Sequence, residues 1–153
     1  MYSRYAVLIF VVFPAIVAGA TYTDAVARKM LTDAGITIVS SGGCSDQNNA
    51  HCTSLTGIHS EVINGAYGII VFKKKSGCAI EVTGGTEIGH AAGTYSHHNG
   101  WKLDIHMTSC MTKYIEKNFQ KVNPTHWKEP GSGYIFYNEN NHWDCCFHAG
   151  CAV

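Results

Sequence analysis

Apolar and polar positions along the chain predict three helices and three strands. The expected helices span residues 24–34, 57–75 and 108–120. The expected strands span residues 36–39, 78–83 and 133–137. The helical segments repeat apolar side chains on one face, whereas the strand segments alternate or run continuously apolar. Thr23 and either Thr108 or Ser109 are expected as N-caps, and Gly35 as the stop of the first helix.

The order of these elements predicts an α+β fold, with about three helices packed against a small, mostly antiparallel sheet. The chain has 153 residues, which is the size of one domain, and no repeat or linker divides residues 21–153. The pair Asn99-Gly100 predicts a two-residue hairpin of type I′, which would bring the residues before it against the segment that follows.

The first twenty residues predict a secretory signal peptide that is cleaved after Ala20. Arg4 supplies a positive start, an apolar stretch follows, and small residues precede the cleavage point. A membrane anchor is the alternative, but the apolar run is interrupted by Pro14 and falls short of the ~20 residues that a span requires. We therefore expect residues 21–153 to be secreted, with no membrane span after cleavage.

The cysteines predict a disulfide-stapled protein. They are Cys44, Cys52, Cys78, Cys110, Cys145, Cys146 and Cys151. In an exported chain such cysteines favour disulfides over a metal site. We expect a local bridge between Cys44 and Cys52, with Cys78–Cys110 and one of the Cys145/Cys146 pair to Cys151 as further candidates. Because the number is odd, one thiol stays free, binds a metal or pairs with another chain. We expect a monomer, with a disulfide-linked dimer as the alternative.

The distribution of charge bears on two kinds of binding site. The formal net charge is zero and no basic stripe exists, so nucleic acid is not an expected partner. The run Lys73-Lys74-Lys75 is interpreted as the solvated end of a helix. Only Arg4 and Arg28 are arginines, and Arg4 lies in the predicted signal peptide. An arginine pocket for carboxylates is therefore nearly excluded.

Nine histidines are a surplus in a chain with so few charges. The predicted turn at Asn99-Gly100 would set His97 opposite Lys102. Side chains alternate along a strand, so Asp104 would share a face with His97, at a Cα distance of roughly 7–8 Å. An imidazole and a carboxylate so placed can meet on one metal ion, while His98 points to the other face. A plain ion pair between His97 and Asp104 is the alternative.

A zinc site needs a third ligand, for which His90, His106 and His142 are candidates. His142 comes three residues after Glu139, so a carboxylate accompanies it. Three protein ligands leave a position for water, whose pKa the metal lowers and whose proton a carboxylate removes. Glu139 and His142 can share a cavity only if the chain bends at Asn140-Asn141. A solvated loop is the alternative interpretation.

The pattern HxxGxxxD from His97 to Asp104, followed by ExxH from Glu139 to His142, resembles the zinc D-alanyl-D-alanine peptidases. That superfamily also includes the hedgehog signalling domain. The resemblance covers roughly residues 55–145 and implies that His97, Asp104 and His142 bind Zn²⁺. It also implies that Glu139 is the catalytic base and that the fold is of the hedgehog/DD-peptidase type.

The chain departs from that family where the family has an arginine, because Thr86-Glu87 stands there instead. His90 is a candidate to replace the arginine as a catalytic electrophile, with a loop histidine as the alternative. Tyr95 is another candidate donor, although core packing is the simpler interpretation. Trp101 and Trp143 are expected to pack beside the site.

The resemblance implies a secreted zinc metallopeptidase that acts on peptides with D-residues. Peptidoglycan stem peptides would be its substrates, cut as by a DD-carboxypeptidase or an endopeptidase, with an antibacterial or feeding role outside the cell. Two other classes stay open. One is a non-catalytic, hedgehog-like zinc domain, which the missing arginine favours and Glu139 opposes. The other is a disulfide-rich secreted toxin without metal.

Overall fold

A computed structural model describes residues 19–153. The predicted signal peptide falls almost entirely on residues 1–18, which lie outside the described residues. Among the described helices, none has the length and apolar character needed to cross a bilayer.

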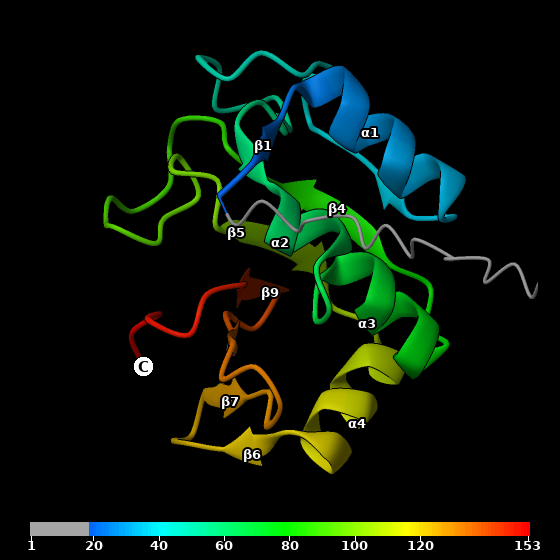
Figure 1. Ribbon diagram of the computed structural model, residues 1–153, viewed down its shortest axis with the longest axis vertical. Coiled ribbons are helices and arrows are strands. Elements are labelled where there is room, and N and C mark those ends of the chain that lie inside the picture. The colour runs from blue at the N-terminus through cyan, green and yellow to red at the C-terminus, as the bar shows by residue number, and fades with distance from the viewer. Residues whose placement is uncertain (1–18) are drawn as a thin grey trace, which may run out of the picture.

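A seven-stranded sheet in the order β2-β4-β5-β9-β8-β7-β6 forms the centre of the protein (Figure 1). Its strands are β2 (Thr37–Ile38), β4 (Glu81–Gly84), β5 (Lys102–His106), β6 (Gln120–Lys121), β7 (His126–Lys128), β8 (Ile135–Asn138) and β9 (His142–Cys146). Neighbouring strands are antiparallel except for β2 and β4. A separate antiparallel pair consists of β1 (Thr21–Tyr22) and β3 (Ile58–His59). The α+β class and the mostly antiparallel sheet are thus confirmed.

The helices are α1 (Asp24–Asp33), α2 (Ser60–Asn64), α3 (Ile69–Ser76) and α4 (Ser109–Asn118). Thr23 and Thr108 cap α1 and α4, because their hydroxyls accept hydrogen bonds from backbone N–H groups in the first turn. The expected helix over residues 57–75 was wrong as one element, because it breaks into α2 and α3. At the break a Cβ on Gly65 would lie 2.6 Å from the carbonyl oxygen of Glu61, a closeness that only glycine allows.

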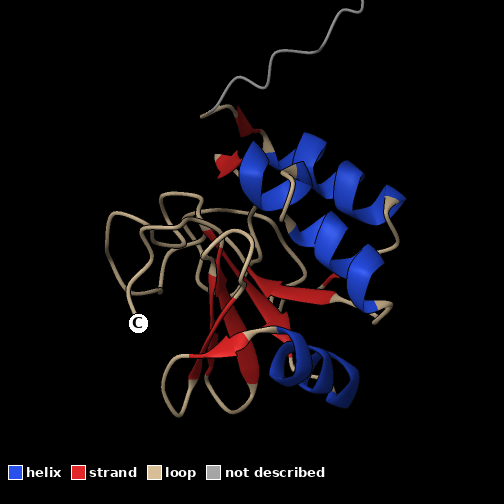
Figure 2. Ribbon diagram, turned by 60° about the horizontal axis from the view of Figure 1, so that its bottom comes forward, coloured by secondary structure: helices blue, strands red, loops and turns tan. Residues whose placement is uncertain are grey.

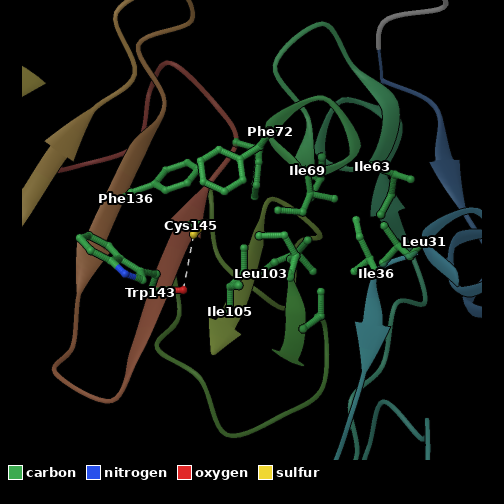
Figure 3. Packing of buried hydrophobic residues seen from close by; sticks show 14 of the residues in the cluster. Leu31, Ile36, Ile63, Ile69, Phe72, Leu103, Ile105, Phe136, Trp143 and Cys145 are labelled. Carbon is green, nitrogen blue, oxygen red and sulfur yellow. Dashed lines mark hydrogen bonds between the residues drawn. The ribbon is translucent and has the colours of Figure 1, made fainter. Parts of the chain in front are cut away.

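The central strands have an apolar face and a polar face. Leu103 and Ile105 of β5 pair with Cys145 and Trp143 of β9, and all four side chains are buried. They pack with helical residues such as Leu31, Ile63, Ile69 and Phe72 in one core (Figure 3). Because side chains alternate along a strand, the residues between them point to the opposite face. That face lies away from the helices, towards the loops and the C-terminal segment seen at the left of Figure 2.

The expected hairpin at Asn99-Gly100 was wrong. Residues 85–100 form a loop, and β5 pairs with β4 and β9. Gly100 has φ 78°, and hydrogen bonds from Gly100 N to His97 O and from Trp101 N to Ser96 O close a compact turn. A two-residue hairpin turn does join β8 to β9, at Asn140-Asn141.

Three disulfides staple the fold: Cys44–Cys52, Cys78–Cys110 and Cys146–Cys151. They confirm the expected local bridge and the two further candidates. Cys145 is the free cysteine, and its thiol is buried in the core, where burial raises its pKa well above the ordinary value. A disulfide to a second chain through Cys145 would therefore require β9 to leave the sheet.

Candidate metal centre

The structure brings His97, Asp104 and His142 together on the polar face of the sheet. Asp104 lies in the middle of β5, His142 is the first residue of β9, and His97 comes from the loop before β5. The Oδ1 atom of Asp104 is 3.2 Å from Nε2 of His97 and 3.4 Å from Nε2 of His142. One carboxylate oxygen therefore faces two imidazole nitrogens.

The compact turn before β5 selects His97 over its neighbour His98. His97 is 4% exposed, whereas His98 is at the surface. Nδ1 of His97 lies 2.8 Å from the carbonyl oxygen of Gly85, so Nδ1 donates a proton there and Nε2 is left to face Asp104. The predicted meeting of His97 with Asp104 is confirmed, although a loop rather than a hairpin produces it.

Glu139 and His142 share one side of the sheet because they end the two-residue turn between β8 and β9. Glu139 N donates to His142 O, and Asn140 has φ 73°, a conformation that asparagine tolerates. The bend expected at Asn140-Asn141 is thereby confirmed. Oε2 of Glu139 is 3.3 Å from Nε2 of His142, and the Glu139 side chain is 37% exposed. His106 pairs with His142 in register but is exposed at the end of β5.

Asp144 is a member of this cluster that the sequence analysis missed. It pairs with Asp104 across β5 and β9, with both side chains on the polar face. Its Oδ2 accepts from Nζ of Lys102 at 2.6 Å, and its Oδ1 lies 3.6 Å from Nε2 of His97. Alternation places Asp144 on the same face as His142, but only the register of β5 with β9 brings it opposite Asp104.

The carboxylates of Asp104 and Asp144 place uncompensated negative charge beside His97. Oδ1 of Asp104 and Oδ1 of Asp144 are buried and accept no hydrogen bond of proper geometry within the described residues. Because His97 donates through Nδ1, its neutral form offers only a lone pair to these oxygens. Like charges directly opposite each other in a sheet are destabilising. The cluster therefore requires a positive charge, either a proton on the imidazole or a metal ion.

Without metal, the close approach of histidines and aspartates shifts the pKa values of both. Burial disfavours the charged form of His97, but the carboxylates of Asp104 and Asp144 outweigh it and raise the pKa of His97 to about 9. Burial likewise opposes ionisation of Asp104, yet His142 and His97 hold its pKa well below the usual range. The nearby carboxylate of Asp104 also raises the pKa of His142. The site is thus built to hold positive charge.

A second histidine, His90, lies on the other side of His97. Ligand atoms of His90, His97 and Asp104 lie within 4.8 Å of one another, so this group could hold a metal ion. The rings of His90 and His97 are stacked, however, with centroids 3.9 Å apart and planes 16° apart. An imidazole lone pair lies in the plane of its ring, so two stacked rings cannot aim at one ion. His90 would have to rotate, whereas the alternative third ligand, His142, is not stacked on His97.

Glu87 holds His90 in this position. Its side chain is 3% exposed, accepts from Ser54 N at 2.8 Å and Gly85 N at 3.0 Å, and lies 3.0 Å from Nε2 of His90. Burial alone would raise the pKa of Glu87, but these hydrogen bonds outweigh it and lower the pKa. A buried carboxylate therefore stands where the resembling family has an arginine. No periodicity in the sequence marked Glu87.

The aromatic residues considered near the site lie in three different surroundings. Trp143 is fully buried in the core, on the opposite face of β9 from His142, so the prediction for Trp143 was wrong. Trp101 stacks on His59, with ring centroids 3.7 Å apart. Tyr95, the other candidate donor, stacks on the ring of His148.

Comparison of the chain with family models, with curated proteins and with solved structures found no match. The site's function therefore has to be argued from its own residues and from the motif resemblance.

Proposed function

We propose that the protein is a secreted zinc peptidase in which His97, Asp104 and His142 hold the metal. The buried, unpartnered Oδ1 of Asp104 between two Nε2 atoms is the observation that carries this proposal. Two imidazoles and a carboxylate form a donor set that suits zinc, and three protein ligands leave one position open, as catalytic zinc sites do. Asp144 adds negative charge beside the same position, which favours a divalent cation.

Neighbouring oxygen atoms orient the two histidine ligands. The Gly85 carbonyl fixes the tautomer and orientation of His97, and Asn141 Oδ1 lies 2.8 Å from Nδ1 of His142. Such partners on the far nitrogen are typical of metal-binding histidines. Zinc, when bound, would supply a Lewis acid that acidifies a water molecule and polarises a peptide carbonyl.

Glu139 is the residue placed to move the proton. Its carboxylate lies within 3.3 Å of the metal-facing nitrogen of His142 and is open to solvent. In the proposed reaction Glu139 accepts a proton from the attacking water and later delivers it to the nitrogen of the leaving amine. The turn at Asn140 sets this side chain beside the site, so the same hairpin provides both a ligand and the base.

The proposed substrates are peptides of the bacterial cell wall. Support comes from the resemblance of the ligand and base motifs to the D-alanyl-D-alanine peptidases. The three disulfides fit an oxidising compartment outside the cell, where such a substrate would be met.

A non-catalytic zinc domain of the hedgehog type is the second candidate, and one observation favours it. Glu87 and its bound His90 replace the arginine that would polarise a substrate carbonyl. The exposed Glu139 beside His142 opposes it, because a purely structural metal site needs no base. The metal-free toxin is disfavoured by the two buried carboxylate oxygens without partners.

Zinc analysis and peptidoglycan digestion test the proposal together. Purified protein should carry about one equivalent of zinc and release stem-peptide fragments, detected by mass spectrometry, in a reaction that a chelator stops. Glu139→Gln should keep the zinc and lose the cleavage, while Glu116→Gln on the exposed side of α4 keeps both. Folded protein with less than about half an equivalent of zinc would overturn the metal site. Equal cleavage by wild type and Glu139→Gln would remove Glu139 from its role.

A further inference from the structure

His90 and His97 approach the carboxylate of Asp104 with two nearly parallel rings. Nε2 of His97 lies 3.2 Å from Oδ1 of Asp104, and Nδ1 of His90 lies 3.6 Å from Oδ2. The ring centroids are 3.9 Å apart, with 16° between the ring planes. Because an imidazole lone pair lies in the plane of its ring, the two histidines aim side by side at different oxygens of one carboxylate.

The distance between His90 and Asp104 is too long for a hydrogen bond between charged groups. Such bonds join donor and acceptor atoms about 2.7–2.9 Å apart, whereas Nδ1 of His90 and Oδ2 of Asp104 are 3.6 Å apart. Metal–ligand bonds of about 2.0–2.2 Å at a tetrahedral angle place two ligand atoms about 3.3–3.6 Å apart. The separations of His97 and His142 from Oδ1 of Asp104, 3.2 Å and 3.4 Å, are close to the same value.

Glu87 fixes which nitrogen of His90 faces Asp104. Nε2 of His90 donates to Oε1 of the buried Glu87 at 3.0 Å, so the neutral ring turns the lone pair of Nδ1 towards Asp104. A carboxylate on the far nitrogen is typical of histidines that bind metal. Gly85 supports both histidines, because its N–H donates to Glu87 and its carbonyl accepts from Nδ1 of His97. The two rings are therefore held in place before any ion binds.

The charge around these ligands favours a second divalent ion. A chain of ion-pair contacts links one ammonium group, on Lys102, to four carboxylates, on Glu87, Asp104, Glu139 and Asp144. With neutral histidines, one divalent ion therefore leaves one negative charge without compensation. That charge attracts a second cation, and the attraction is strong beside Asp104 because its side chain is only 11% exposed.

We propose that His90 and Asp104 bind a second divalent transition-metal ion beside the first, with the carboxylate of Asp104 as the bridge between the two ions. The inference rests on the proposed metal centre at His97, Asp104 and His142, and it makes that centre dinuclear. Imidazole and carboxylate ligands suit Zn²⁺, and the ions of two-metal hydrolytic sites lie about 3.5–4 Å apart, close to the spacing of the stacked rings. Among the described residues, two reach the second position, so water completes its coordination and the second ion binds more weakly than the first.

Counting bound zinc at fixed free Zn²⁺ tests this assignment. Purified protein is stripped with a chelator, dialysed against increasing free Zn²⁺, and measured by elemental analysis. Wild type should bind two equivalents in two separate steps. His90→Gln, whose amide can still donate to Glu87, should bind one equivalent, whereas His98→Gln at the surface should bind two. A single equivalent in the wild type would overturn the second site and leave the first standing, and no bound zinc would overturn both.

Paramagnetic Co²⁺ distinguishes a bridged pair from a second ion bound elsewhere on the surface. Two Co²⁺ ions that share one carboxylate couple magnetically, so the second equivalent should change the electron paramagnetic resonance signal of the first. Glu87→Gln should weaken binding of the second ion about tenfold to a hundredfold, and that of the first ion far less. Signals that simply add, or a second equivalent that persists in His90→Gln, would overturn the bridge. Because neither readout needs turnover, a dinuclear protein without peptidase activity would count against the proposed reaction alone.

Discussion

Asp104 of β5 and Asp144 of β9 face each other directly across the sheet, and each buries an Oδ1 atom that accepts no hydrogen bond within residues 19–153. Two facing carboxylates repel each other, and the one lysine in contact, Lys102, neutralises only the far oxygen of Asp144. The negative charge of the two Oδ1 atoms is therefore uncompensated next to Nε2 of His97, which lies within 3.6 Å of both. Metal binding should therefore be coupled strongly to the stability of the sheet.

Zinc should stabilise the protein, and Asp144→Asn should weaken that effect. At a zinc concentration of 100 times Kd the gain is about 2.7 kcal/mol, or roughly 5–10 °C in the midpoint of thermal unfolding for a domain of this size. Loss of the Asp144 charge should lower zinc affinity about tenfold to a hundredfold, measured by competition with a chelator of known affinity. Asp33→Asn, on the exposed end of α1, is the matched control. Unchanged zinc affinity in Asp144→Asn would exclude Asp144 from the metal centre.

The metal-free protein should lose stability as pH rises from neutral to alkaline. The folded-state pKa of His97 is about 9, above its ordinary value of 6.5. Its contribution is therefore fully present below pH 6.5 and is lost as pH rises through 9, by at most about 3 kcal/mol. Urea unfolding between pH 6 and 9.5 with a chelator present measures this fall. His97→Gln should flatten the dependence, and a wild-type free energy of unfolding that does not fall would contradict the ion pairs of His97.

Zinc should offset that pH dependence, so that the stability of the zinc-loaded protein changes less with pH than that of the metal-free form. The ion needs the unprotonated Nε2 of His97, so binding displaces a proton below about pH 9. Apparent zinc affinity should rise by up to about tenfold per pH unit over this range. The zinc-loaded protein should then be more stable, relative to the metal-free form, at pH 8.5 than at pH 6.5.

Local sequence signals predicted the segments that form β2, β4 and β8 and the approach of Asp104 to His97. They did not predict the central strand β9 or the contacts that its pairing creates. Asp104 could be assigned to one face of its strand because alternation depends on a single strand, and its neighbours Leu103 and Ile105 are buried in the core. The hairpin predicted at Asn99-Gly100 was wrong, since turn propensity there cannot tell a hairpin from a compact turn that ends a loop. Glycine at the left-handed position serves both.

The dependence on contacts between distant segments explains why the carboxylates of Asp144 and Glu87 were missed. Asp144 belongs to the site through its pairing with Asp104, and that register forms between strands 40 residues apart in the chain. Glu87 is buried because backbone N–H groups of Ser54 and Gly85 surround it, a loop arrangement that leaves no periodic trace. Both residues depend on long-range contacts, whereas Glu139 and His142 needed only a local bend.

Gly84→Ala should disturb the candidate metal centre without replacing any of the proposed metal ligands. Gly84 pairs with Asp104 across β4 and β5, and a Cβ there would lie 2.6 Å from Oδ2 of Asp104. Asp104 is held between two strands and cannot yield freely, so its carboxylate should turn away from His97. We expect zinc affinity to fall at least about tenfold, with a stability loss of about 1–3 kcal/mol from overpacking. Gly93→Ala is the control, because a Cβ on Gly93 meets no atom within 4 Å. Zinc affinity that is equal in the two variants would show that the Asp104 carboxylate does not need this close approach of β4.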